Sequence, residues 1–148
     1  MWVIFDLDGT LADIEERRTL ASKGDGKINW GIFFDPKNIA LDKPLKKTIL
    51  LLQSLKAQGY GIAIFSGRGA ETRAVTIDWL KEFGVEFDKL IMRPVQDYTP
   101  DDELKLGWLN SEFPNRDQVL CVFDDRNKVV DMWRREGLLC CQVAPGDF

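Results

Sequence analysis

Short apolar runs alternate with longer mixed segments along this chain. Five runs are apolar at nearly every position and have the length of strands that are buried on both faces. They cover residues 2–5, 61–65, 89–92, 119–123 and 138–143. With helices expected between them, this order predicts an α/β fold, a doubly wound parallel sheet with helices on both faces and right-handed crossovers.

The expected helices are bounded by residues that favour helix starts and stops. Apolar residues recur at helical spacing from Leu45 to Leu55. Asp42 stands where an N-cap is expected, with Pro44 in the first turn, and Gly59 is suited to end this helix. Two further helices are expected over about 70–83 and about 127–136. Another is expected to begin with Asp101 or Asp102 as its N-cap and to include Lys105.

Residues 12–41 do not fit this alternation. They are polar and irregular, include Arg17 and Arg18, and carry the aromatic residues Trp30, Phe33 and Phe34. Thirty residues are too many for a plain loop in a compact domain. We interpret the segment as a small cap or lid inserted after the first strand, although its aromatic residues could also form a minor apolar cluster. Residues 1–148 otherwise form one domain.

Composition narrows the class of protein. The 148 residues are 45% hydrophobic and 30% charged, which is ordinary for a globular domain with one core. No run is long enough to span a membrane and no signal peptide is visible, so we expect a cytoplasmic protein. Cys121, Cys140 and Cys141 lie in apolar runs and are expected to be buried thiols. The net charge of −4 argues against broad binding to duplex nucleic acid, and no oligomer is indicated.

Polar side chains follow three of the five strands. Asp6 and Asp8 follow the first, Ser66-Gly67-Arg68 the second, and Asp124-Asp125 the fourth. Because ligands of such sheets bind at the carboxyl ends of strands, we expect these clusters to converge. Neighbouring carboxylates repel unless a cation or a shared proton compensates, and oxygen ligands favour Mg²⁺. The sequence therefore predicts a magnesium site, although the Asp124-Asp125 pair could instead cap the following helix.

The same clusters suit hydrolysis of a phosphate monoester, which requires a nucleophile, charge neutralisation and a proton for the leaving group. The chain has no histidine, so the acid or base must be a carboxylate, Lys, Tyr or Cys. Ser66 and the backbone around Gly67 could hydrogen-bond phosphate, and Arg68 offers a bidentate fork. Lys105 could supply a point charge and restrain Asp6, or could be a solvated helix residue.

The stretch Asp6-Leu7-Asp8-Gly9-Thr10-Leu11 resembles the signature of the haloacid dehalogenase-like (HAD) phosphotransferases without departure. Ser66, Lys105 and Asp124-Asp125 match the other three motifs of that family in order. The resemblance implies a Rossmann-like HAD fold and an aspartyl-phosphate mechanism.

The roles implied for single residues follow from those motifs. Asp6 is expected to be the nucleophile and Asp8 the general acid/base, with Thr10 and Gly67 beside the phosphate. Mg²⁺ is expected to bind Asp6, the backbone carbonyl of Asp8, and Asp125. Asp124 is expected to lie next to the metal without binding it.

A narrower resemblance links the chain to the 3′-phosphatase domain of bacteriophage polynucleotide kinase/phosphatase. It rests on residues 66–68, 101–105, 123–126, 129–135 and 142–148. It implies removal of 3′-phosphates, and of cyclic 2′,3′-phosphates, from nucleic-acid ends, with Arg17 (or Arg18) and Asp101 contributing to the site. No Gly-x-x-x-x-Gly-Lys-Ser/Thr loop occurs, so this chain lacks a kinase domain. Residues 12–41, which would choose the substrate, match poorly.

Three alternatives remain open at this stage. The first is the same chemistry on small molecules such as nucleoside monophosphates. The affinity for a nucleic-acid strand should rise with chain length and fall with salt, whereas the affinity for a mononucleotide should not. The second is a non-enzymatic receiver-like domain, whose phosphorylated Asp would stand where this chain has Met92-Arg93-Pro94. The third is a binding subunit without activity, which the complete set of motif residues argues against.

Overall fold

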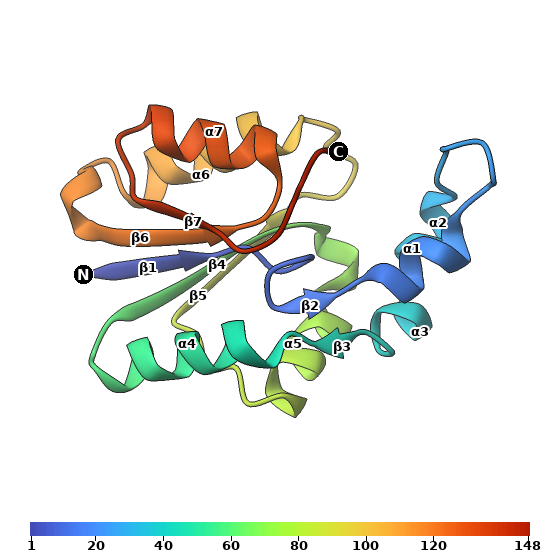
Figure 1. The fold of residues 1–148 in the computed structure, drawn as a ribbon, viewed down its shortest axis with the longest axis horizontal. Coiled ribbons are helices and arrows are strands. Elements are labelled where there is room, and N and C mark those ends of the chain that lie inside the picture. The colour runs from blue at the N-terminus through green and yellow to red at the C-terminus, as the bar shows by residue number, and fades with distance from the viewer.

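The computed structural model describes residues Met1 to Phe148 and is built around a five-stranded parallel sheet (Figure 1). In spatial order the strands are β5 (Lys89–Arg93), β4 (Gly61–Gly69), β1 (Trp2–Phe5), β6 (Val119–Asp124) and β7 (Cys140–Gln142). All neighbouring strands run parallel. The chain begins at the centre, builds one side of the sheet and then crosses to the other, which confirms the doubly wound α/β fold.

Two helices cover each face of this sheet (Figure 1). On one face lie α4 (Lys46–Ala57) and α5 (Arg73–Glu82), and on the other α6 (Asp101–Glu112) and α7 (Asn127–Arg135). Short 3-10 turns precede α5 and β6, at Ala70–Thr72 and Arg116–Gln118. None of the helices has the length and apolar character needed to cross a bilayer.

Side chains on the two faces of β1 belong to two separate apolar clusters, because successive side chains of a strand point to opposite sides. Val3 and Phe5 belong to the cluster under α4 and α5, whereas Ile4 belongs to the cluster under α6 and α7. The ring of Phe5 stacks on that of Phe123 with centroids 4.7 Å apart. Each large side chain buried in this way contributes about 1.5–3 kcal/mol. This packing fixes the ends of β1 and β6, where the polar residues begin.

The three cysteines are free thiols, as the sequence predicts. Cys121 and Cys140 are buried, and Cys141 is half-buried. Burial raises the pKa of Cys121 to about 11 and that of Cys140 to about 12. Thiols of this kind are structural rather than reactive.

Residues 12–41 are helical rather than irregular, which corrects the expectation from the sequence. The segment contains β2 (Ala12–Asp13), α1 (Glu15–Ala21), α2 (Trp30–Phe33) and α3 (Pro36–Ile39). β2 pairs antiparallel with β3 (Lys43–Pro44), which closes the segment at its base. It projects from the edge of the sheet at which the strands end (Figure 1). Phe33 is buried, as expected for a minor apolar cluster, whereas Trp30 is exposed, as expected for a cap or lid.

Several boundaries differ from those expected. Asp42 is not an N-cap: α4 begins at Lys46 after Leu45, because Lys43 and Pro44 pair with β2 instead. α6 follows Pro100 at its N-cap, so Asp101 and Asp102 lie within its first turn. β4 continues to Gly69, beyond the expected end at Phe65.

Candidate active site

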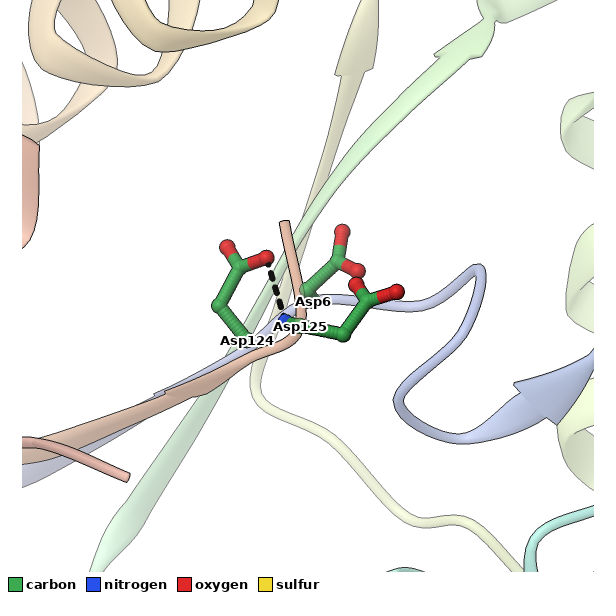
Figure 2. A group of neighbouring side chains, drawn as sticks. All are labelled: Asp6, Asp124 and Asp125. Atoms are coloured by element: carbon green, nitrogen blue, oxygen red, sulfur yellow. Dashed lines mark hydrogen bonds between the residues drawn. The ribbon is translucent and has the colours of Figure 1, made fainter. Parts of the chain in front are cut away.

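Three carboxylates meet where β1 and β6 end. The backbone N–H of Asp6 donates to the carbonyl oxygen of Phe123 at 2.9 Å, which sets Asp6 beside Asp124 and Asp125. One carboxylate oxygen from each aspartate lies within 4.8 Å of the others, and all three residues are buried. In Figure 2 the carboxyl groups of Asp6 and Asp125 face each other, whereas that of Asp124 turns away.

Lys105 enters this cluster from α6. Its Nζ lies 2.7 Å from Asp6 Oδ1 and 3.1 Å from Asp124 Oδ2, and the residue is 2% exposed. The alternative of a solvated helix lysine is therefore wrong. Burial alone would lower the pKa of Lys105, but Asp124 and Asp6 outweigh it and raise that pKa, so the ammonium group stays charged.

Asp124 is fully engaged by protein groups. Its Oδ2 accepts from Lys105 and from Trp133 Nε1 at 3.1 Å, and its Oδ1 accepts from the backbone N–H of Asp125 at 2.8 Å. The last bond goes to a residue ahead of α7, whose N-cap is Arg126 and has no side-chain cap hydrogen bond, so the capping alternative is wrong for Asp124. Asp125 makes no such bond and leaves its carboxylate turned toward Asp6 (Figure 2).

The cluster carries more negative than positive charge. Three carboxylates and one ammonium group leave an excess of two negative charges when all are ionised. Burial and the neighbouring Asp124 raise the pKa of Asp6 well above its usual range, although Lys105 opposes that rise. Burial, aided by Asp124, also raises the pKa of Asp125 to about 6. Because a divalent cation would offset this excess and carboxylate oxygens are ligands that Mg²⁺ prefers, the residues fit a magnesium ion.

Asp8 is held by two arginines on the other side of the site. Its Oδ1 accepts from Arg17 Nη2 at 2.9 Å and from Arg68 Nε and Nη2 at 2.9 and 2.6 Å. Burial would raise the pKa of Asp8, but the guanidinium groups of Arg68 and Arg17 outweigh burial and lower that pKa. Arg17 is therefore the arginine that binds Asp8, whereas Arg18 lies over the ring of Phe148.

Asp42 completes this group, and the sequence analysis missed it. It is buried and accepts from Arg17 Nε at 2.9 Å and from Arg68 Nη2 at 3.1 Å. Burial raises the pKa of Asp42, and the two guanidinium groups oppose that rise. The one local signal was an acidic residue directly after the segment 12–41, and a helix cap explained that residue equally well. Arg68 also donates to Thr76, so its nitrogens are engaged within the protein, which indicates a role in holding Asp8.

Three smaller groups line the strand ends. Thr10 is buried and donates to Asp6 Oδ2 at 3.2 Å. Ser66 is buried at the end of β4, and its Oγ accepts from the backbone N–H of Arg68 at 3.2 Å. Gly67 packs closely on Asp101, since a Cβ at this position would lie 2.9 Å from the Asp101 carboxylate.

Asp101 joins two more arginines rather than the aspartate cluster. It bonds Arg93 from the end of β5, and its Oδ2 accepts from Arg126 Nη1 at 2.9 Å. Arg93 in turn donates to the carbonyl oxygen of Gly67 at 3.0 Å. Asp101 therefore fixes the turn around Gly67, and Arg93 is a further residue that the sequence analysis did not single out.

A cavity of about 270 Å³ opens beside Asp125. Ile14 and Arg18 from the inserted segment line one side, and Pro145 and Phe148 from the C-terminal tail line another. Gly9 lies at its floor, where its φ of +83° and the nearby Asp125 carboxylate leave no room for a side chain. The cavity therefore reaches Asp125 from between the inserted segment and the C-terminal tail.

Comparisons with known proteins agree with this geometry. The family model for the phosphatase domain of polynucleotide kinase PNKP matches residues 1–148. A protein of Autographa californica nuclear polyhedrosis virus, described as "Putative bifunctional polynucleotide kinase/RNA ligase", is 33% identical over 135 residues, and the match covers 89% of this chain and 17% of that protein.

Solved structures extend the comparison. A chain in the structure of the Pnkp1/Rnl/Hen1 RNA repair complex is 34% identical with a TM-score of 0.82, and the match covers 99% of this chain and 43% of that chain. A predicted phosphatase from Clostridium acetobutylicum shares the fold at 17% identity, with a TM-score of 0.73 over 95% of this chain and 83% of that one. The chain thus spans less than half the length of its two more similar relatives. It belongs to the family of PNKP phosphatase domains and is a phosphatase of the HAD-like class.

Proposed function

We propose that this phosphatase removes the 3′-phosphate from nucleic-acid ends, in a Mg²⁺-dependent reaction through an aspartyl-phosphate on Asp6. The position of the Asp6 carboxylate carries this proposal. Lys105 Nζ lies 2.7 Å from Oδ1, and Thr10 Oγ1 donates to Oδ2 at 3.2 Å. A carboxylate restrained at both oxygens is pre-oriented for attack, which lowers the entropic part of the barrier.

The reaction uses two steps. In the first, Asp6 attacks phosphorus, the bond to the 3′-oxygen breaks, and Asp8 protonates that leaving oxygen. In the second, Asp8 takes a proton from water, which attacks the aspartyl-phosphate and releases inorganic phosphate. Lys105 and the hydroxyl of Ser66 stabilise the charge on the transferring group.

Asp8 must change its protonation state between these steps. Its side chain is 23% exposed, so a substrate oxygen can reach it. The paired arginines favour the ionised form, which accepts the proton in the second step. A phosphate dianion brought close to Asp8 favours the protonated form, which donates in the first step.

Mg²⁺ would be held by Asp6, Asp125 and the backbone carbonyl of Asp8, and would supply neutralisation of charge on the phosphate oxygens. Asp124 supports this arrangement through its bonds to Lys105 and Trp133, without offering a free oxygen. This ligand set is the one that the resemblance to HAD phosphotransferases implies, and the excess of carboxylates over ammonium groups in the cluster supports it.

The substrate class rests on the family and its relatives. The viral protein is described as a polynucleotide kinase/RNA ligase, and the solved relative belongs to an RNA repair complex. We assign residues 12–41 as a small cap on a single domain of residues 1–148, because Ile14 and Arg18 from this segment line the cavity beside Asp125. Cyclic 2′,3′-phosphates are a second substrate class expected from the same site.

The test measures phosphate release from four substrates, each with Mg²⁺ and with EDTA. They are a 3′-phosphorylated oligonucleotide, its 5′-phosphorylated twin, a 3′-mononucleotide and a 2′,3′-cyclic oligonucleotide. We expect Mg²⁺-dependent preference for the 3′-oligonucleotide. Equal or better use of the mononucleotide would instead place the enzyme in nucleotide metabolism, and release from none of them would refute the proposed substrate.

The covalent step has its own control. Asp6→Asn keeps the shape of the side chain but removes the nucleophilic charge, so it should fold normally and lose turnover. Activity above about a few per cent of the parent would rule out the aspartyl-phosphate, since a nucleophile usually supplies several orders of magnitude.

A further inference from the structure

The loop between β5 and α6 carries an aromatic side chain that the reaction does not use. Tyr98 is 89% exposed, more than any other large hydrophobic residue of the chain. The loop follows the carboxyl end of β5, on the same edge of the sheet as the aspartate cluster (Figure 1). An exposed ring at the edge of an active site is a candidate contact for substrate.

This loop is braced rather than loose. Arg93 Nη1 donates to the carbonyl oxygens of Asp97 at 3.1 Å and Thr99 at 2.6 Å. The backbone N–H of Thr99 donates to Asp97 Oδ1 at 2.9 Å. Gln96 adopts a φ of +60°, a conformation that persists in a non-glycine residue when its surroundings hold it. Tyr98 is therefore presented by a fixed backbone, which reduces the entropy lost on binding.

Arg93 also connects the loop to the turn at Ser66 and Gly67, where the phosphate is expected to bind. Arg93 Nε donates to the carbonyl oxygen of Gly67 at 3.0 Å, and Gly67 directly follows Ser66. One side chain thus links the backbone on both sides of Tyr98 to the end of β4. The backbone that carries Tyr98 is therefore held in place relative to the end of β4.

Tyr98 differs from the other two exposed aromatic residues in having no ring or cation partner. Trp30 packs against Phe33 and Phe34, with centroids 5.5 and 5.9 Å away. Phe148 lies under the guanidinium groups of Arg18 and Arg126, at 4.7 and 5.5 Å. Of the three, the ring of Tyr98 alone is free to stack on something outside the protein.

We propose that Tyr98 stacks on a base of the strand that carries the terminal phosphate, and so makes the enzyme prefer a strand to a small phosphate ester. The inference rests on the proposed function and adds the residue that recognises the strand. A single ring suits a nucleobase, since each base offers one flat face and stacking tolerates any sequence. A protein partner would require a broad apolar patch, but the loop neighbours Asp97 and Thr99 are polar.

The test compares two substrates in four variants. The measured quantity is kcat/KM for a 3′-phosphorylated hexanucleotide divided by kcat/KM for p-nitrophenyl phosphate, so general damage to the site cancels. Tyr98→Ala should lower this ratio about 5- to 150-fold, mainly through KM, as expected for one lost base stack. Tyr98→Phe and Tyr98→Trp should keep it, because stacking does not need the hydroxyl. Val95→Ala, on the same loop and also exposed, is the matched control and should keep it too.

An unchanged ratio in Tyr98→Ala would overturn the inference, as would an equal loss in Val95→Ala. The proposed function itself fails if the parent enzyme releases no phosphate from the hexanucleotide, which is a separate measurement. In that case an oligonucleotide containing 2-aminopurine still decides the role of Tyr98 in the Asp6→Asn background. Fluorescence quenching on binding that disappears with Tyr98→Ala supports stacking, and quenching that persists excludes it.

Discussion

Replacing Asp42 with Asn should destabilise the fold and disable the site together. Asp42 is 4% exposed, and its partners Arg17 and Arg68 are each 1% exposed. With Asp8 they form a group of two cations and two anions joined by ion pairs of 2.6–3.1 Å. Asn preserves the shape of Asp42 but removes one negative charge, so a net positive charge stays buried.

The size of the effect follows from that uncompensated charge. Removing one partner of a buried ion pair typically lowers the free energy of unfolding by about 3–5 kcal/mol. Asp8 still faces both arginines and is partly reached by water, so we expect a loss of about 3 kcal/mol. Domains have unfolding free energies of about 5–15 kcal/mol, so the variant still folds at 25 °C. Turnover should fall at least about 100-fold, since the arginines no longer hold Asp8 in place.

Urea unfolding followed by tryptophan fluorescence measures the first effect. Trp79 is a suitable reporter because its indole N–H donates to the carbonyl oxygen of Asp42 at 2.9 Å. Asp78→Asn, the same substitution at an exposed position of α5, is the matched control and should change stability by less than about 0.5 kcal/mol. A loss below about 1 kcal/mol in Asp42→Asn, together with normal turnover, would refute the reasoning.

Three further predictions concern the metal site and the thiols. Asp125→Asn should raise the Mg²⁺ concentration for half-maximal activity about 10- to 100-fold, whereas Asp124→Asn should lower kcat with a smaller shift; a metal titration that gives the reverse order contradicts the assignment. Mg²⁺ at tenfold its dissociation constant should raise the melting temperature of the parent by about 3–6 °C, and no shift in a thermal melt would argue against a bound ion. Iodoacetamide at pH 8 should label Cys141 first, because the raised pKa values of buried Cys121 and Cys140 leave little thiolate; mass spectrometry that finds either buried thiol labelled earlier would contradict this.

The sheet and the cluster at its edge could be predicted from the sequence because both follow from local patterns. Apolar runs of strand length define β1, β4 and β6, and parallel strands bring their carboxyl ends together whatever lies between them. This reasoning is sufficient to join Asp6 with Asp124 and Asp125 across more than a hundred residues. The position of Lys105 needed the family resemblance, because a helix lysine has no local signal for burial.

The inserted segment could not be predicted in the same way. α2 and α3 have four residues each, too short to show helical periodicity. Asp42 before Lys43-Pro44 carries the local features of a helix cap, but pairing of β3 with β2 and two buried arginines determine its actual role. Each of these contacts joins residues about 25 or more positions apart or on separate elements, so no window of sequence contains both partners.

The ion pairs among Arg17, Asp42, Arg68 and Asp8, at the base of the inserted segment, also indicate where the sequence can be changed without affecting the site. Arg17 and Asp42 stand near the two ends of the segment; Arg17 pairs with Asp8 at the end of β1, and Asp42 pairs with Arg68 of β4. The stretch 22–27 at the far end is exposed and contributes none of these charges. Substitutions and insertions there should leave in place the ion pairs that orient Asp8. The base of the segment is thus fixed by ion pairs whereas its tip is not, which marks residues 22–27 as a place where a new recognition sequence can be grafted without moving Asp8.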